Sequence, residues 1–369
     1  MRRILIYLFE LIMMFAVFVV CDMPGTIKYA VVALLSILFL LLGRKKKWSA
    51  ESLICVSLPM IVYLMIGGFT SLINASAYSF TVKIFLFWLI PFLFAFSLYV
   101  FYGQDMARIV DVQFLASVLV YLITKGRFIL ETFTVESMFA YTYGAFFVYY
   151  AHKKNWVFCA IAAFGMVLTD KRIVVMAVMV AVLIRGILWL FRNDKRAALF
   201  MWGGTALISN IYLWLVYSGI LEAFCKGVGI NTNGRVKMYG KVAEWFGGNF
   251  LSFGNGLGSV ETLLSAWNVE KFSNLHNDLL KFHIELGFWG LLLYFISFGI
   301  AFYFIEKKCG NKPMSLFVSM AVYTMMLFST DNVSIYIIFL LPVYSIYFAV
   351  LSANAKEVIE EEHDRKNSQ

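Results

Sequence analysis

The stretch "NLHNDLLKFHIELGFWG" at 274–290 gathers side chains that can do chemistry in a chain that is otherwise strongly apolar. Histidine exchanges a proton near neutral pH, so His276 is a candidate general base, with Asn277 beside it. Glu285 follows nine residues later, and His283 lies near the same face of a helix as His276. The stretch therefore marks His276, Asn277 and Glu285 as candidate site residues.

A metal site is not predicted here. Zinc-binding histidines on a helix prefer a spacing of three or four residues together with further ligands, and Glu285 alone does not complete a set. We expect neither a metal nor another cofactor. An alternative stays open, in which His276 caps a helix and His283 faces lipid headgroups.

A second stretch, "FLSFGNGLGSVE" at 250–261, alternates glycines at Gly254, Gly256 and Gly258. Glycine permits positive φ and close approach of the backbone, so amide groups here can cradle an anionic part of a substrate. A plain turn is the alternative. The run does not fit a dinucleotide fingerprint, which also needs a strand inside a βαβ unit.

Two arginines stand where an anion could bind. "LTDKR" at 168–172 places Asp170 and Lys171 before Arg172, at the start of an apolar segment. Arg235 opens the main part of "NTNGRVKMYGKVAEWFGG" at 231–248, which has the spacing of a short amphipathic helix on the membrane surface. Guanidinium groups bind phosphate through two parallel hydrogen bonds, although Lys171 can also simply reach lipid phosphates.

The composition places these residues on an integral membrane protein. Of 369 residues, 62% are hydrophobic and only 14% are charged, and the mean hydropathy is +0.80. The apolar runs are too long and too weakly alternating for barrel strands, so we expect an all-α polytopic membrane protein with about twelve transmembrane helices. The predicted spans are 4–20, 27–43, 50–66, 80–102, 109–123, 138–151, 156–168, 173–191, 197–217, 287–305, 314–328 and 333–351.

Lys and Arg in the short loops set the expected orientation, because such loops stay in the cytoplasm. Basic residues occur in alternate connections, at 43–47, 103–108, 152–155, 192–196 and 306–312, while those at 21–26, 67–79 and 329–332 contain none. Both termini are therefore expected inside. The net charge of +9 reflects this topology and gives no support for a nucleic-acid partner.

The same pattern divides the chain into four parts. Residues 1–217 form membrane helices 1–9, and 218–286 form one large extracytoplasmic loop with short helices. Residues 287–352 form helices 10–12, and 353–369 form a cytoplasmic tail. Long loops between tight connections usually carry function, which focuses attention on 218–286.

Taken together, these motifs resemble the bacterial O-antigen ligase and O-antigen or capsular polysaccharide polymerase superfamily. Nine residues separate His276-Asn277 from Gly287, and two more separate Gly287 from Gly290, as in the histidine motif of that superfamily. Arg172, Arg235 and the glycine run precede it in the family's order. The resemblance covers nearly the whole chain in architecture and about 120 residues in motifs.

The resemblance implies glycan transfer between lipid-linked substrates at the outer face of the bacterial cytoplasmic (inner) membrane. The donor would be an oligosaccharide on undecaprenyl diphosphate, with Arg172 and Arg235 at the diphosphate and His276 as base. Transfer would be metal-independent and would invert the anomeric centre. Membrane lipids, a chain-length regulator and a flippase of the same pathway are the further expected partners.

The residues leave three functions open. A polymerase, which joins repeat units in capsule or lipopolysaccharide synthesis, is preferred because no element for a lipid A core is recognised. An O-antigen ligase that transfers glycan to lipid A core is the alternative. A lipid-linked glycan transporter would need ionisable residues deep in spans, and the candidates are Glu10, Lys83, Asp111 and Arg185.

Overall fold

The structure is a computed structural model that describes residues 2–43, 50–74, 78–230, 232, 234–267 and 274–367. The described chain is helical, and within it the sole β-type pairing is an isolated antiparallel bridge between Phe253 and Gly287. The expected all-α fold is therefore confirmed. Of the loops used to assign orientation, residues 44–47 and 75–77 lie outside the described residues.

The long helices follow the predicted spans in order. They are α1 (Arg2–Asp22), α2 (Ile27–Gly43), α3 (Ala50–Asn74), α4 (Tyr78–Tyr102), α5 (Met106–Thr132), α6 (Phe139–Lys153), α7 (Trp156–Leu168), α8 (Arg172–Leu190), α9 (Lys195–Tyr217), α13 (Asp278–Cys309), α14 (Asn311–Phe328) and α15 (Ile337–Asn367). Short 3₁₀ turns, η1 (Gly103–Asp105) and η2 (Val333–Ile335), precede α5 and α15.

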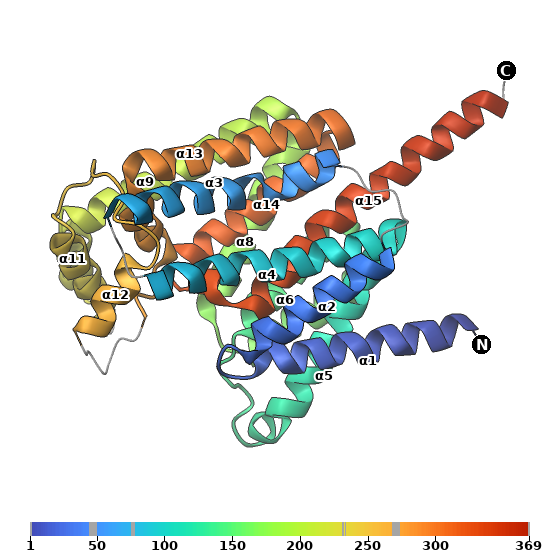
Figure 1. The fold of residues 1–369 in the computed structure, drawn as a ribbon, viewed down its shortest axis with the longest axis horizontal. Helices are drawn as coiled ribbons and strands as arrows, with labels where there is room; N and C mark the ends of the chain where they lie inside the picture. The colour runs from blue at the N-terminus through green and yellow to red at the C-terminus, as the bar shows by residue number, and fades with distance from the viewer. Residues whose placement is uncertain are drawn as a thin grey trace.

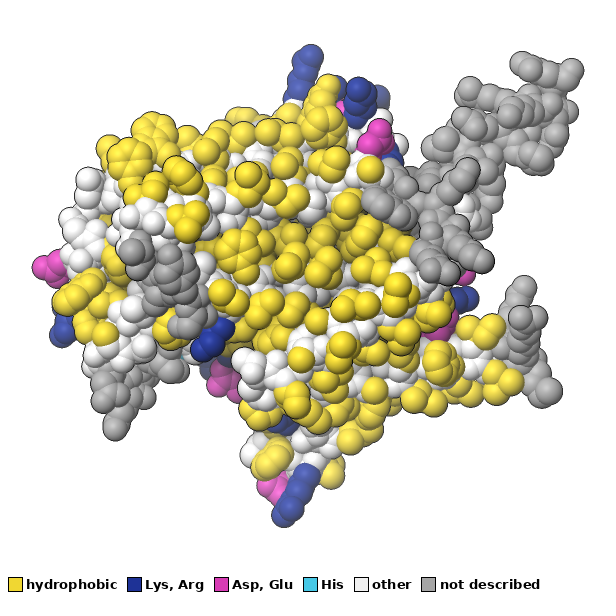
Figure 2. Space-filling model, viewed as in Figure 1, with side chains coloured by type: hydrophobic (Ala, Val, Ile, Leu, Met, Phe, Trp, Pro, Cys, Tyr) yellow, Lys and Arg dark blue, Asp and Glu magenta, His cyan; other side chains and the backbone are white. Residues whose placement is uncertain are grey.

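Six described segments are long and apolar enough to cross a membrane, and one of them, Phe80–Thr132, joins most of α4 to η1 and α5. Three shorter apolar helices, α2, α7 and the first part of α15, accompany them. Figure 2 shows hydrophobic side chains over the middle of one face, with most charged side chains toward its periphery. The chain is a multi-pass membrane protein, and the number of twelve spans stays a prediction.

The two ends of the helix bundle differ. The start of α1 and the last turns of α15 lie at one end, here called the terminal end, and the short helices α11 and α12 lie at the other, here called the loop end (Figure 1). This arrangement is the one that termini on one side and a large loop on the other require. The side of the membrane on which each end lies stays a prediction.

The large connection after α9 folds into three short helices, α10 (Ile220–Gly227), α11 (Arg235–Trp245) and α12 (Ser259–Ala266). The expected helix at 231–248 is thus present as α11, but it does not lie with its apolar side on the membrane. Tyr239 and Val242 are buried, because that side packs against α9 and α10. In the neighbouring helix α10, by contrast, Phe224 is exposed and no residue is buried.

Helix α13 begins inside the predicted loop and continues across the expected boundary at 287. Its N-cap is Asn277, whose side chain accepts a hydrogen bond from the Leu280 amide at 2.9 Å. Gly287 interrupts the helix with φ +75° and ψ 172°. The helix packs along α3, α9 and α14, and α14 is buried over nearly its whole length. The loop before α13 contacts the helix at this break.

Candidate functional site

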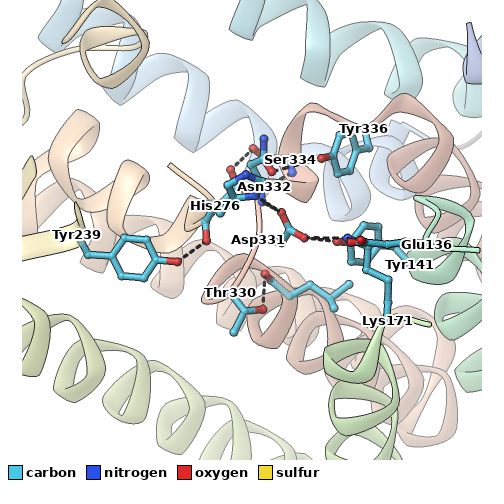
Figure 3. A network of polar contacts seen from close by, with 12 residues as sticks. Glu136, Tyr141, Lys171, Tyr239, His276, Thr330, Asp331, Asn332, Ser334 and Tyr336 are labelled. Carbon is cyan, nitrogen blue, oxygen red and sulfur yellow. Dashed lines mark hydrogen bonds and ion pairs between the residues drawn. The ribbon is translucent and has the colours of Figure 1, made fainter. Parts of the chain in front are cut away.

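His276 lies at the loop end, two residues before the first residue of α13. Its backbone has φ +53°, an uncommon conformation for a residue with a Cβ. The backbone carbonyl accepts a hydrogen bond of 2.8 Å from the Tyr239 hydroxyl of α11. The side chain is 30% exposed, and its Nδ1 lies 2.9 Å from Oδ1 of Asp331 (Figure 3). Both its main chain and its ring are held in place from different elements.

The partner of Nδ1 decides which ring nitrogen is available to a substrate. An ionised carboxylate only accepts hydrogen bonds, so Nδ1 of His276 carries the hydrogen that it donates to Asp331. In the neutral ring, Nε2 then holds the lone pair. This arrangement suits a general base, because the carboxylate fixes the tautomer and stabilises the imidazolium formed when Nε2 takes a proton.

Asp331 lies in the turn after α14, and its side chain is 7% exposed. Besides His276, it accepts hydrogen bonds from the Tyr141 hydroxyl and from the Asn332 amide at 2.9 Å. Lys171 Nζ is 3.7 Å from Oδ2. Burial alone would raise the pKa of the Asp331 carboxyl, but the hydrogen bonds from His276, Tyr141 and Asn332 outweigh it and lower the pKa to about 2. Asp331 is therefore a fixed negative charge.

Lys171 comes from the turn between α7 and α8 and connects the predicted basic motif to this network. Its Nζ is 2.5 Å from Oε1 of Glu136 and lies over the ring of Tyr141, 5.6 Å from the centroid (Figure 3). Asp170 and Arg172, the chain neighbours of Lys171, are not part of this network. Asp170 is exposed in a positive-φ turn, and Arg172 is the exposed first residue of α8, without a hydrogen bond or ion pair from its side chain to another described residue.

Arg235 lies on α11, the helix that contacts the His276 backbone through Tyr239. It is the exposed first residue of α11, one helical turn before Tyr239, whose hydroxyl binds the His276 carbonyl. Burial raises the pKa of the Tyr239 phenol, and the positive charge of Arg235 opposes that rise. Lys171 is linked to His276 through Asp331, and Arg235 lies one helical turn from Tyr239.

The glycine run supplies backbone hydrogen bonds to α13 at the break in that helix. The break at Gly287 leaves helical carbonyls without their usual partners, and the Gly256 amide donates to the Glu285 carbonyl at 3.0 Å. A Cβ on Gly254 would stand 2.3 Å from that carbonyl oxygen, and a Cβ on Gly287 would stand 2.4 Å from the Gly254 nitrogen. Only glycines permit this approach, so the contact explains their positions.

The Glu285 side chain continues the same contact. It is fully buried, and its two oxygens accept hydrogen bonds from the Gly258 amide at 2.7 Å and from the Tyr63 hydroxyl at 3.0 Å. Gly258, with φ +84°, is the N-cap of α12. Glu285 therefore ties α13 to α12 and α3. These residues were predicted to contact the substrate, and the structure places them beneath the site, bound to one another.

Asn277 and His283 also lie within the protein. Asn277 is fully buried; besides capping α13, it donates to the Tyr212 hydroxyl at 2.8 Å. The expectation that His276 caps the helix is thus wrong, because its neighbour does. The expectation that His283 faces headgroups is also wrong. Its ring is fully buried, 2.9 Å from the Tyr217 hydroxyl and stacked on Phe250.

The comparison with known families fits this geometry. Residues 157–295 match the family model described as O-antigen ligase. This region, less than half of the chain, is similar to that family and is here called the O-antigen ligase domain. The match confirms the resemblance to the O-antigen ligase and polymerase superfamily, whose members are glycosyltransferase-like enzymes. A comparison with curated proteins finds no match to the chain.

The O-antigen ligase domain contains Arg172, Arg235 and His276, but it ends before the residue that holds the histidine. Asp331 was missed by the sequence reasoning, in which "STDN" served only as a loop without basic residues. The available signal was an acidic side chain at the loop end of an apolar helix, on the face where charge is otherwise scarce. Tyr141 carried no such signal.

The charged residues considered for a translocation path have partners within the protein. The pairs are Glu10 with Arg108 (2.8 Å), Asp111 with Tyr150 (3.0 Å), Arg185 with His152, and Lys83 with the Phe80 ring (5.0 Å to its centroid). None of these pairs includes a residue of the His276–Asp331 network. Across the described part of the chain, no three His, Cys, Asp or Glu side chains group as metal ligands.

Proposed function

We propose that this O-antigen ligase-type protein is a polysaccharide polymerase that joins oligosaccharide repeat units carried on undecaprenyl diphosphate. The observation that supports it best is the held imidazole of His276, with Nδ1 bound to Asp331 and Nε2 left for a hydroxyl. Arg235 and Lys171 give the same region a positive charge. A base beside fixed cations is what transfer from a diphosphate leaving group needs.

The reaction balances as a single displacement. The acceptor hydroxyl oxygen attacks the anomeric carbon of the donor glycan, and its proton passes to Nε2 of His276. The bond between that carbon and the diphosphate oxygen breaks, and the diphosphate leaves with the electron pair. Arg235 and Arg172 stabilise the charge that gathers on it, while Asp331 stabilises the imidazolium. Attack from the face opposite the leaving group inverts the anomeric centre.

The predicted substrate contacts fall into two groups within this proposal. Lys171 lies at the edge of the network, where it pairs with Glu136 and Asp331, and Asp170 is exposed beside it. Asn277, Glu285 and the glycine run are bound inside the protein, so their contribution is to set the position of His276 and the start of α13. We therefore assign direct contact to His276, Arg235, Arg172 and Lys171.

An O-antigen ligase is the second candidate, and the description of the matched family favours it. We prefer the polymerase because no element for a lipid A core is recognised in the sequence. Deletion of the gene and gel analysis of surface glycan separate the two functions. Capped single repeats indicate a polymerase, and long polymer that stays unattached indicates a ligase. Unchanged surface glycan would contradict both.

The catalytic assignment is tested on purified protein with a synthetic lipid-diphosphate repeat unit. His276→Ala is expected to lower transfer by roughly 10²–10⁴-fold, the range for a positioned base. Product should still form when a chelator is present. Transfer by His276→Ala at the wild-type rate would exclude the proposed base, and loss of all product with chelator would exclude a metal-independent reaction.

The orientation is tested separately by labelling single cysteines from outside the cell. A cysteine introduced at Asn249, in the loop after α11, is expected to react with an impermeant reagent, whereas one at Asn193, between α8 and α9, is not. The opposite pattern would place the site in the cytoplasm and rule out polymerisation at the outer face.

A further inference from the structure

A small polar cavity lies beside the His276–Asp331 pair at the loop end. Its volume is about 20 Å³, which exceeds the roughly 10–15 Å³ that one water molecule or one hydroxyl group needs. Leu275 and Asn277, the chain neighbours of His276, both line it. Asn332, which follows Asp331, lines it as well (Figure 3). The cavity therefore adjoins the chain segments of both residues of the pair.

Three of the polar side chains around the cavity already use their hydrogen bonds within the protein. The Asn277 amide is bound at both its oxygen and its nitrogen. The two carboxylate oxygens of Asp278 accept hydrogen bonds of 2.7 Å from the Ser334 hydroxyl and the Ser334 amide. The Lys281 ammonium pairs with Oε1 of Glu261. These contacts hold the walls of the cavity in place.

Two other lining residues have a buried polar atom without a partner. Nδ2 of Asn332 and Oε2 of Glu261 make no hydrogen bond to any residue in the described ranges. Asn332 itself is 6% exposed. The amide nitrogen is a donor, and the carboxylate oxygen, paired through its other oxygen with Lys281, is an acceptor. Since buried polar groups are almost always hydrogen-bonded, a donor and an acceptor at one cavity indicate a bound group that serves both.

A hydroxyl group meets this requirement, because its hydrogen donates and its oxygen accepts. A diphosphate offers only acceptors, and it would bring a negative charge toward the Glu261 carboxylate. An ammonium group offers only donors and would leave the Asn332 amide unpaired. An apolar group would leave both atoms unpaired. The cavity therefore selects a neutral hydroxyl, and glycans are rich in such groups.

We propose that this cavity, here called the hydroxyl site, recognises one hydroxyl group of a sugar next to the bond being formed, with Glu261 accepting its hydrogen and Asn332 donating to its oxygen. The inference rests on the proposed glycan transfer and adds to it a pair of residues for sugar specificity. The arginines bind the diphosphate, which every lipid-linked repeat unit carries. The hydroxyl site reads the sugar, in which the positions of the hydroxyl groups differ.

The consequence is discrimination between sugars. A sugar that lacks this hydroxyl leaves both buried atoms without a partner, so its transfer should be slow. Once the protein has lost one of the two atoms, the same sugar has less to lose. Water is the competing occupant, since a water molecule also donates and accepts. A bound water would stay in place whichever sugar is offered, and it predicts no discrimination.

The test uses Asn332→Ala, with Asn249→Ala as its matched control. Asn249 is exposed in the loop after α11 and is not among the described residues that line the cavity. Transfer is measured with monodeoxy analogues of the synthetic repeat unit, which keep the reacting hydroxyl and are placed once as acceptor and once as donor. In the wild type and in Asn249→Ala, one analogue should react roughly 10–100-fold more slowly than the parent repeat unit.

In Asn332→Ala the same analogue and its parent should differ by less than about threefold. The arm in which the analogue is slow assigns the hydroxyl to the acceptor or to the donor. Glu261→Gln keeps the size of the side chain and should also reduce the discrimination, so it tests the proposal if Asn332→Ala does not accumulate. Equal rates for all analogues in the wild type, or full discrimination in both variants, would overturn the proposal.

A binding measurement keeps the hydroxyl site separate from the reaction. His276→Ala protein in nanodiscs lacks the base and retains the cavity. It should bind the same analogue at least about tenfold more weakly than the parent repeat unit, and addition of Asn332→Ala should remove that difference. If this binding pattern holds but no protein variant transfers glycan, the proposed function fails and the hydroxyl site stands. Equal binding of all analogues would make the cavity a water site.

Discussion

Replacing Asp331 with asparagine removes one negative charge beside His276 and nearly preserves the size of the side chain. Transfer is expected to slow, because asparagine no longer stabilises the imidazolium through the contact 2.9 Å from Nδ1 and no longer enforces a hydrogen on that nitrogen.

The magnitude follows from that distance. Two unit charges 2.9 Å apart attract by about 1.4 kcal/mol at the dielectric constant of water and by about 6 kcal/mol at an effective dielectric of 20. The His276 side chain is 30% exposed, and Lys171 Nζ lies 3.7 Å from the other carboxylate oxygen, so both screen the pair. The lower part of the range, about 1.4–3 kcal/mol, predicts a loss of roughly 10–100-fold in rate.

The assay measures transfer by protein in lipid nanodiscs from about pH 4.5 to about pH 9. Hydrogen bonds lower the pKa of Asp331 to about 2, below the ordinary carboxyl value of the unfolded chain. Its contribution to stability is thus complete above that ordinary value and is lost only as the pH falls toward 2, outside the range of the assay. Asp331 therefore keeps its negative charge across the range of the assay.

Asp170→Asn is the matched control, since it removes the same charge from an exposed turn near the network. It should leave the rate of transfer almost unchanged. A rate within threefold of wild type in Asp331→Asn would refute the idea that this carboxylate supports the base.

The remaining predictions concern the scaffold and the cation. Gly287→Ala should destabilise the protein by about 1–3 kcal/mol or more, measured by thermal unfolding in detergent, because φ is +75° and the new Cβ would meet the Gly254 backbone; an unchanged midpoint would contradict the broken-helix contact. His283→Ala should lower stability by about 2 kcal/mol, since the ring is fully buried, yet retain far more transfer per folded molecule than His276→Ala. Arg235→Lys should insert normally and lose at least about tenfold in transfer, because lysine lacks the planar fork; full activity would make Arg235 a surface charge.

The sequence predicted the helices well because their apolar runs are local and long. It also identified His276, Arg235 and Lys171 as candidates, because histidine commonly transfers protons and arginine and lysine commonly bind anions. It did not predict the pairing of His276 with Asp331, 55 positions later. Such a contact depends on how α13 and α14 pack, and no periodicity within one helix contains that information.

In the glycine run the sequence showed the local pattern but did not show what the glycine amides bind. Glycine near a charged motif allows an amide cradle for phosphate, and the sequence offers no way to tell a ligand from another part of the chain. In the structure the Gly256 amide binds the Glu285 carbonyl of α13. The decisive fact was the break at Gly287, which creates carbonyls in need of donors in the middle of an otherwise helical segment.

The break in α13 also bears on how the chain is inserted during synthesis. The part from Phe288 to Cys309 is 22 residues long, about 33 Å of helix, and can span a bilayer alone. The part before it carries Asp278, Lys281 and Glu285, which a lipid environment would oppose. The glycine run precedes α13 in the chain, so it is synthesised before the helix that it contacts. His276 would then reach its position beside Asp331 only at the last stage of membrane assembly, when the polar first turns of α13 pack against the glycine run.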